Sequence, residues 1–407
     1  MSVYLLATLD TKGREAEFLR QRLRACGARV TLVDTGALGS PACAADISRE
    51  ELFHAGGARL EEIVAQADRG QAVAAAAVSA AKLLREHHVA GKITGVLAIG
   101  GSAGSTIGSA AMRVLPLGVP KLLVSTLASG QVRHYVGDKD ILMLNAVVDI
   151  SGLNRISRTI LDEAARAMAG MVCMPAAKQN IDDKPLVAAT MFGVTTPCVE
   201  KARQVLEAAG YEVLVFHATG AGGQAMESLV ADGLIAGVLD ITTTELADEF
   251  AGGMLTAGPD RLTAAGRAGV PQVISVGATD MANFHARETV PERFSGRKFY
   301  QHNANVTLMR TTAEENERIG ADIGRKAAAA RGPTVIMLPE QGVSAIDRAG
   351  QPFDDPAARA TLFDAIRRNA GTTEVVSLDD HINDPEFAEA AATRLITMMK
   401  LRSQNRS

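Results

Sequence analysis

The chain has 407 residues and a formal net charge of −4, and 47% of its residues are hydrophobic against 22% charged. This length allows two or three domains with separate cores, and the composition is that of an ordinary globular protein. The small net charge and an aromatic content of 4%, with no tryptophan, disfavour a nucleic-acid partner, which would need a basic surface or stacking rings.

The first half alternates strands and helices. Its continuous apolar runs have the pattern of parallel strands buried on both faces: 3–8, 29–33, 96–99, 121–125 and a fifth candidate at 140–145. Helices are predicted between and after these strands. Their ranges are 14–26, a short helix in an irregular excursion at 40–57, one or two helices at 59–88, and helices at 105–114 and 155–171. This alternation predicts a doubly wound parallel sheet.

A polar linker at 175–184 precedes the second half. Strands are predicted in this half at 213–216, 237–241, 272–276, 334–338 and 373–378, and helices at 197–209, 313–330, 357–369 and 385–401. We expect the last two strands to extend the second sheet. The predicted domains are therefore 1–178 and 184–407.

The two halves share an internal repeat. Three pairs of segments align in the same order: 3–36 with 186–220, 93–106 with 235–248, and 118–126 with 269–277. In the first pair, an apolar run ending in Ala-Thr leads through a loop into an amphipathic helix, a glycine and a second apolar run. We therefore predict an α/β fold of two Rossmann-like domains with parallel sheets, which arose by internal duplication.

A glycine-rich turn after the strand at 96–99 is the strongest candidate for ligand binding. Glycines let the backbone approach a ligand, hydroxyls add donors, and the N-terminus of the next helix favours an anion such as phosphate or carboxylate. The candidate nucleotide-binding residues are Gly100, Gly101, Ser102, Gly104, Ser105 and Thr106. The turn lacks the lysine of a Walker A loop and the GxGxxG spacing, so a tight turn capped by hydroxyls is the alternative. The matching segment of the second half, 241–245, has threonines and a glutamate instead of glycines.

The segment after the first strand is the second candidate. Asp10, Thr11 and Lys12 follow the carboxyl end of that strand, the edge where open α/β sheets bind ligands. Lys12 could pair with a phosphate, and Asp10 could hold a metal ion or a ribose hydroxyl. A helix cap with a solvated lysine is the alternative.

Polar residues of the second half form a less specific group: Asp280, His285, Arg287, His302, Asn303, Asp347 and His381. They could line a small-molecule site, bind a divalent metal or carry acid–base chemistry, although no HxH or HExxH spacing supports a metal. Structural hydrogen bonding is the alternative, and catalytic residues remain unassigned. Asn303 and Asn305 are predicted to share one strand face. In the first half, the polar stretch 126–151 could line a site or form a subunit interface.

Several motifs together resemble one protein family. They are ATLDTKG at 7–13, IGGSAGST at 99–106, VVDISGLNRISR at 147–158, GVTTPCVEKAR at 193–203 and VSAIDRAGQPFDDP at 343–356. Over essentially the whole chain, the sequence is similar to the Tm-one-like ATP-binding family, the bacterial relatives of the tomato mosaic virus resistance protein, whose function in bacteria is unknown.

The resemblance implies a homodimer and bound ATP, with Mg²⁺ as a candidate companion. The ATP contacts that it implies fall on the two segments singled out above. In the plant protein, the matching region precedes a TIM-barrel domain that resembles phosphoenolpyruvate-handling enzymes. This chain has no such barrel, so a separate TIM-barrel protein is a candidate partner.

Two classes of function fit these observations. The first is an ATP-binding enzyme or enzyme subunit that acts on a small acid or a sugar-derived metabolite, which is expected to bind in the cleft between two related domains. The second is a non-catalytic, nucleotide-responsive scaffold that dimerises and docks a partner protein. Measuring turnover separates the two classes. An enzyme would lose turnover when its site residues are replaced, whereas a scaffold would tolerate these replacements as long as it folds.

The sequence also indicates a location. Its four cysteines are scattered, without a CxxC pair, and no signal peptide is expected at the start of the chain. The longest apolar stretch, 72–81, is too short and too rich in alanine to cross a bilayer. We therefore expect a cytoplasmic protein with free thiols and no membrane segment.

Overall fold

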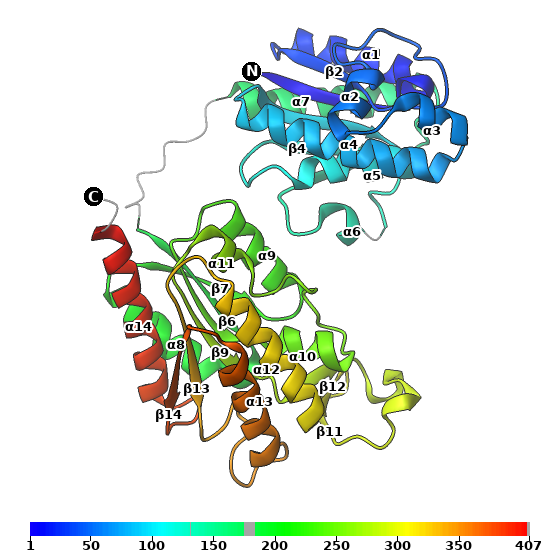
Figure 1. Cartoon of the computed structure of the whole chain (residues 1–407). Helices are drawn as coiled ribbons and strands as arrows, with labels where there is room; N and C mark the ends of the chain where they lie inside the picture. The colour runs from blue at the N-terminus through cyan, green and yellow to red at the C-terminus, as the bar shows by residue number, and fades with distance from the viewer. Residues whose placement is uncertain (131, 175–183, 405–407) are drawn as a thin grey trace. The chain divides into compact units, whose positions relative to one another are not determined.

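Two parallel β-sheets, one in each half of the chain, organise the fold (Figure 1). The computed structural model describes residues 1–130, 132–174 and 184–404. The chain divides into unit 1, Met1–Asn180, and unit 2, Ile181–Ser407. The predicted linker at 175–184 lies outside the described residues except for Lys184.

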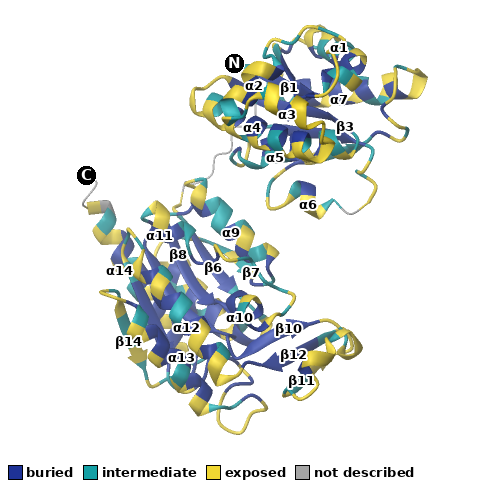
Figure 2. Cartoon of the chain, turned by 45° about the vertical axis from the view of Figure 1, so that its right-hand side comes forward, coloured by how far each residue is buried: buried dark blue, intermediate teal, exposed yellow. Residues whose placement is uncertain are grey.

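Unit 1 contains a five-stranded parallel sheet in the order β2-β1-β3-β4-β5. Its strands are β1 Ser2–Ala7, β2 Val30–Asp34, β3 Ile93–Gly100, β4 Lys121–Ser125 and β5 Leu142–Asn145. Its helices are α1 Leu9–Ala25, α2 Arg49–Gly56, α3 Leu60–Gln66, α4 Arg69–Val89, α5 Ser102–Arg113, α6 Arg133–Val136 and α7 Arg155–Cys173. Helices α1 and α7 pack on one face of the sheet and α2 to α5 on the other, so the central strands are buried on both sides (Figure 2).

Unit 2 contains a six-stranded parallel sheet in the order β14-β13-β9-β8-β6-β7. Its strands are β6 Leu186–Met191, β7 Glu212–His217, β8 Gly237–Thr242, β9 Gln272–Gly277, β13 Thr334–Pro339 and β14 Glu374–Leu378. Its α-helices are α8 Thr196–Ala208, α9 Ala221–Ala231, α10 Thr244–Ala251, α11 Ala264–Ala268, α12 Ala313–Ala328, α13 Pro356–Asn369 and α14 Pro385–Gln404. Helices α8 and α14 cover one face, and α9 to α13 cover the other.

The strand orders of the two sheets confirm the predicted duplicated α/β architecture. The series β2-β1-β3-β4 in unit 1 corresponds to β7-β6-β8-β9 in unit 2, and β5 and β13 occupy the next position in each sheet. As predicted, the strands beyond the repeat, β13 and β14, extend the second sheet.

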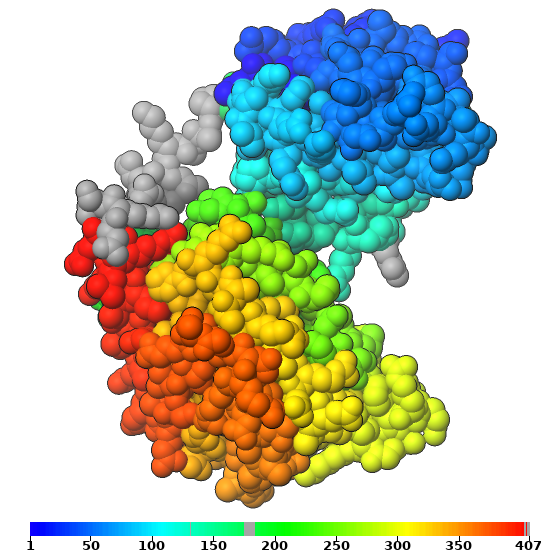
Figure 3. All heavy atoms as spheres, viewed as in Figure 1, coloured from blue at the N-terminus to red at the C-terminus, as the bar shows by residue number. Residues whose placement is uncertain are grey.

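A small antiparallel sheet in unit 2, β10-β12-β11, was not predicted. It consists of β10 Met281–Phe284, β11 Phe299–Asn303 and β12 Val306–Arg310. The segment between β10 and β11, with the 3-10 turns Arg287–Thr289 and Glu292–Phe294, projects from the body of unit 2 (yellow, Figure 3). Asn303 ends β11, whereas Asn305 lies in the turn and donates its backbone N–H to Asn303 Oδ1 at 2.8 Å. The prediction of a shared strand face is wrong because the chain reverses between them.

Two helices begin earlier than the sequence pattern indicates. Helix α1 begins at Leu9, where the N–H groups of Thr11 and Lys12 donate to Thr8 O at 3.1 and 2.7 Å, with a kink at Lys12. Helix α5 begins at Ser102. Both candidate ligand segments are therefore first turns of helices rather than loops. Helices α6, α10 and α11 were missed because they are short, and α9 was missed because a glycine precedes it and glycines occupy its first turn, where they give no amphipathic pattern.

Candidate functional site

The carboxyl ends of β1 and β3 form the topological switch point of unit 1. The chain leaves β1 towards β2 on one side and leaves β3 towards β4 on the other, and open α/β sheets bind ligands at this position. A pocket of about 400 Å³ lies there, within the range of about 300–1,000 Å³ that is usual for small-molecule sites. It is lined by Thr8, Asp10, Thr11, Thr35, Gly36, Ala37, Leu38, Gly39, Arg69, Ala72, Val73, Ala103 and Ile107.

Two of the predicted ligand residues, Asp10 and Thr11, line this pocket. Lys12 and the six predicted residues of the glycine-rich turn are not among its lining residues. Asp10 Oδ2 accepts a hydrogen bond from the Gly39 N–H at 3.2 Å, whereas its Oδ1 is buried and has no partner among the described residues. A Cβ on Gly36 would lie 2.8 Å from Asp10 Cγ, so glycine is needed there to leave room for the carboxylate. Asp10 therefore offers an unused acceptor beside the pocket.

The loop after β2 is held in place by the buried carboxylate of Asp34. Its Oδ1 accepts the N–H groups of Leu9 at 3.0 Å and Gly36 at 2.9 Å, and its Oδ2 accepts from Arg49 Nε at 3.1 Å. One side chain thus joins the start of α1, the loop at 35–39 and α2. This arrangement positions two walls of the pocket.

The predicted glycine-rich turn forms the start of α5, and its glycines allow close packing. A Cβ on Gly100 would lie 2.7 Å from Gly104 Cα, and one on Gly104 would lie 2.7 Å from Ile99 O. Among the described residues no side chain caps this helix, so its first N–H groups remain available to an anion. Ala103, in the first turn, lines the pocket.

The hydroxyls of this turn are used within the fold. Ser105 is buried and its Oγ lies 2.6 Å from Ser125 Oγ, while Thr106 Oγ1 donates to Ser102 O at 2.9 Å. The turn therefore presents backbone N–H groups to the pocket rather than these two side chains. None of the described residues of the stretch 126–151 lines the pocket.

Sequence reasoning missed Arg69 and the loop at 35–39. Arg69 is exposed at the first position of α4 and brings a positive charge to the pocket. The loop follows a predicted strand and reads Thr-Gly-Ala-Leu-Gly. Glycines after a parallel strand were the available signal for the loop, whereas a single arginine in a polar segment has no distinctive pattern.

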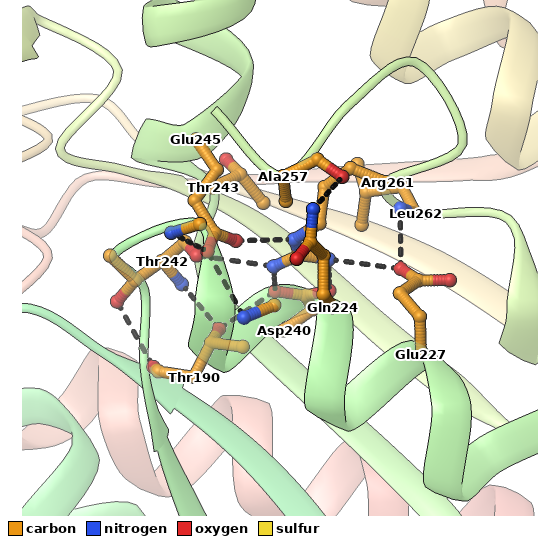
Figure 4. Close-up of polar contacts among 12 residues, drawn as sticks. Thr190, Gln224, Glu227, Asp240, Thr242, Thr243, Glu245, Ala257, Arg261 and Leu262 are labelled. Carbon is orange, nitrogen blue, oxygen red and sulfur yellow. Dashed lines mark hydrogen bonds and ion pairs between the residues drawn. The ribbon is translucent and has the colours of Figure 1, made fainter. Parts of the chain in front are cut away.

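The switch point of unit 2, between β6 and β8, is filled by its own side chains (Figure 4). The guanidinium of Arg261 donates to both oxygens of Asp240 at 2.5 and 2.6 Å and to Glu245 Oε2 at 2.6 Å. It also lies 3.3 Å from Glu227 Oε1. The Arg261 side chain is fully buried, and its three carboxylate partners hold the pKa of its guanidinium well above the usual value.

Glu245 occupies the N-terminus of α9, where a phosphate could otherwise bind. Its Oε1 accepts the N–H groups of Gly220 at 2.6 Å and Gly223 at 3.0 Å. A Cβ on Gly223 would lie 2.1 Å from Glu245 Oε2, so the helix approaches this carboxylate as closely as glycine allows. Glu245 stands at the position that aligns with the glycine-rich turn of unit 1. The N-terminus of α9 in unit 2 thus already binds a carboxylate of the same chain.

The structure divides the polar residues predicted in the second half. His285, His302 and Asn303 line a pocket of about 430 Å³ beside the carboxyl edge of the second sheet. Arg287 lies outside this pocket, with its guanidinium carbon 3.9 Å from the centroid of the Phe299 ring.

The other members lie in a buried cluster. Ser344 Oγ donates to Asp280 Oδ2 at 2.9 Å, and Arg359 Nη1 donates to both oxygens of Asp347 at 3.1 Å. His381 Nε2 lies 2.9 Å from Ser344 O. Burial raises the pKa of Asp280 to about 7 and lowers the pKa of His381. These contacts connect the loop after β13 to the loop after β9, which is a structural role.

Two further findings concern metal binding and membrane-spanning helices in the described part of the chain. No group of three or more histidines, cysteines, aspartates or glutamates among them could hold a metal ion. None of the helices in the described part is both long and apolar enough to cross a membrane.

Comparison with known proteins identifies the family. The N-terminal domain of the uncharacterised protein family UPF0261 matches residues 1–177, and the C-terminal domain of that family matches residues 184–399. The chain belongs to this family. A UPF0261 protein of Clostridium tetani is 47% identical over 98% of this chain and 99% of its own length. The ToMV resistance protein Tm-1(GCR237) of Solanum lycopersicum is 40% identical over 95% of this chain and 54% of its own length.

These relatives confirm the family resemblance read from the motifs. Among solved structures, the glycosyltransferase SnogD from Streptomyces nogalater is 12% identical over 98% of both chains, with a TM-score of 0.18. A similarity of that size carries no argument about the fold or the function of this chain.

Proposed function

We propose that this UPF0261 protein binds ATP in the pocket of unit 1. The observation that carries the proposal is the uncapped N-terminus of α5, which lies beside Asp10 and Arg69 at the topological switch point. Helix N-termini and arginine side chains both stabilise phosphate groups. The resemblance to an ATP-binding family supports the same ligand.

The residues around the pocket of unit 1 offer partners for the phosphates and for the ribose of a nucleotide. The first N–H groups of α5, at Ser102 and Ala103, would hold phosphate oxygens together with Arg69. The free Oδ1 of Asp10 would accept a ribose hydroxyl or bind Mg²⁺ that accompanies the phosphates. ATP, when bound, supplies a transferable phosphoryl group. Lys12, one turn along α1, would add positive charge near the entrance.

The proposal limits each chain to one nucleotide. In unit 2 the helix that corresponds to α5 is α10. Glu245 in its first turn directs its carboxylate to the N-terminus of α9, and Arg261 is saturated by three carboxylates. A phosphate there would meet a buried negative charge. In the part of the chain that the structure describes, the switch point that combines a pocket with an uncapped helix N-terminus is the one in unit 1.

We further propose that the protein is a cytoplasmic enzyme or enzyme subunit that acts on a small acid or a sugar-derived metabolite, as a homodimer. The second candidate is a nucleotide-responsive scaffold for a partner such as a TIM-barrel protein. The tomato relatives favour this candidate, because this chain matches only 54% and 55% of their length. ATP hydrolysis or transfer, measured with candidate acids, separates the two candidates.

The first test is calorimetric titration with ATP, with and without Mg²⁺. Gly101→Asp should abolish binding because it places a carboxylate where the phosphate belongs, and the Cβ position is open, with its nearest atom 3.6 Å away. Gly296→Asp in unit 2 makes the same charge change in open space and should bind as the wild type does. Equal affinity of the two variants would remove the α5 turn from the proposal. No binding by the wild type would reject ATP as the ligand.

A further inference from the structure

The pocket of unit 2 is built differently from the pocket of unit 1. It has a volume of about 430 Å³ and is bounded by the end of β6, the end of β7 and the small antiparallel sheet. Its lining is mostly apolar, with Phe192, Phe284, Leu255, Val306 and Leu308 among its walls. The Phe192 ring stacks on the imidazole of His217, with centroids 5.4 Å apart and planes 25° from parallel. Flat apolar walls of this kind suit a cyclic or planar ligand body.

The polar groups of this pocket are unusual in kind. Three histidines, His217, His285 and His302, contribute to the lining and are exposed. Among the described residues that line the pocket there is no aspartate, glutamate, lysine or arginine. The three imidazoles are therefore its only ionisable side chains, and no carboxylate in the lining would repel an anion.

Asn283 provides an independent sign that the pocket receives a ligand. Its side chain is 99% buried and it lines the pocket, yet its Oδ1 has no hydrogen-bond partner among the described residues. Buried polar atoms are seldom left unpaired, because the lost hydration costs free energy.

The orientation of this amide is fixed from behind. Asp248 Oδ1 accepts the backbone N–H of Asn283 at 2.7 Å, and Asp248 Oδ2 accepts from Asn283 Nδ2 at 2.6 Å. Thr244 Oγ1 lies 3.3 Å from the same nitrogen. Because Nδ2 is directed to Asp248, the carbonyl oxygen is turned away from it and remains the unused acceptor.

We propose that this pocket binds a small hydroxy acid, with its apolar ring or chain between Phe192 and Phe284. The ligand's hydroxyl donates to Asn283 Oδ1, and its carboxylate or phosphate is held by His217, His285 and His302. An enzyme would need a substrate site, and we assign that role to this pocket. This assignment rests on the proposed function. The binding itself requires no nucleotide.

The test uses three matched probes and the full chain at pH 6, where an ordinary imidazole is mostly protonated and a benzoate is ionised. They are 4-hydroxybenzoate, benzoate, which lacks the hydroxyl, and 4-hydroxybenzamide, which lacks the charge. Saturation-transfer NMR should rank 4-hydroxybenzoate first. Loss of one hydrogen bond to a neutral acceptor weakens binding about three- to tenfold, and loss of the charged contact weakens it about tenfold or more.

Variants assign the two ends of the ligand. His285→Gln and His302→Gln change exposed side chains, and each should weaken both acids several-fold while leaving 4-hydroxybenzamide unchanged. His134→Gln, which replaces an exposed histidine of unit 1, is the matched control and should change nothing. Asn283→Leu should remove the preference for 4-hydroxybenzoate over benzoate. If Asn283→Leu does not fold, benzoate and the two histidine variants still decide the result.

Three results would overturn the proposal. They are no binding of any probe in the millimolar range, equal binding of the three probes, and unchanged acid binding in both histidine variants. The probes are titrated without ATP, so a protein that fails to bind ATP can still bind them. Failure here would leave the result of the ATP titration intact, and the two proposals are judged separately.

Discussion

The buried side chain of Arg261 and its carboxylate partners fill the switch point of unit 2. The Arg261 guanidinium is shared among Asp240, Glu245 and Glu227 in the interior of unit 2, where the charges are screened little by water. A buried ion pair does not in itself stabilise a fold greatly, but removing one partner leaves charges that nothing neutralises. The network therefore fixes the arrangement of β8, α9 and α10 around one arginine.

Arg261→Met should be strongly destabilising. It leaves three carboxylates without their cation, and breaking buried pairs of this kind costs about 3–5 kcal/mol. Urea unfolding of unit 2 provides the measurement. Arg267→Met is the control, because the Arg267–Asp260 pair is exposed and worth at most about 1 kcal/mol. A similar loss of unfolding free energy in the two variants would contradict the prediction, because the buried network would then contribute no more than an exposed ion pair.

Asp248 gives unit 2 a pH-dependent stability. Burial raises its pKa from the ordinary value of 3.8 to about 7. The folded state therefore holds its proton more tightly than the unfolded state, so the stabilisation is complete below pH 4 and is lost as the pH rises to 7. The shift of about 3 pKa units corresponds to about 4 kcal/mol at most.

In Asp248→Asn this pH dependence should be absent. The free energy of unfolding of the wild type should fall, relative to that of the variant, between pH 4 and pH 7 and stay level above pH 7. Denaturant titrations at several pH values measure the slope, and the slope is the readout because the substitution also alters hydrogen bonds. Asp260→Asn, at a mostly exposed carboxylate, should keep the wild-type slope. A wild-type slope in Asp248→Asn would contradict the assignment.

At the scale of elements, the start of α5 separates two roles for glycine. Gly104 allows contact between helix and strand, since its Cβ would lie 2.7 Å from Ile99 O, whereas Gly101 faces open space. Gly104→Ala should therefore lower the free energy of unfolding of unit 1 by about 1–3 kcal/mol, and Gly101→Ala should change it by less than about 0.5 kcal/mol. Thermal or urea unfolding measures both. A tolerated Gly104→Ala would mean that the helix can shift away.

The elements also show which sequence signals are reliable. Strands such as β3 and β9 were readable because a strand buried on both faces needs a continuous apolar run. Strand β11, Phe-Tyr-Gln-His-Asn, is short, half-exposed and polar, and the sequence contains no local pattern that distinguishes it from a loop. The pocket of unit 2 depends on that sheet, so its full lining could not be derived from the sequence.

The candidate site of unit 1 was partly predictable for a related reason. Residues that follow strands of the repeat, such as Asp10 and Gly101, inherit their position from the sheet. Arg69 and Asp34 act through contacts between segments far apart in the chain, and only the folded structure reveals them. The use of Ser105 within the core likewise depends on its partner Ser125 on the next strand.

At the scale of the whole molecule, each unit has the parts of an independent domain. Separate apolar clusters lie on both faces of each parallel sheet. We expect the fragments 1–178 and 184–407 to fold when produced separately, each with a cooperative unfolding transition. Circular dichroism with urea measures this. A fragment that stays unfolded would show that its unit requires the other half of the chain.

The carboxylate of Glu245 has a consequence for how the two halves respond to their surroundings. A ligand that binds only the folded state stabilises it according to the logarithm of its concentration. The anion at the N-terminus of α9 is tethered to the chain, so its occupancy cannot be diluted away and this helix end gains nothing when phosphate compounds accumulate. Unit 1 has no such tethered group, and its melting temperature should follow the supply of its ligand. If unit 1 binds ATP as proposed, duplication has left one chain with one helix end whose anion is fixed and another whose anion varies with the nucleotide supply.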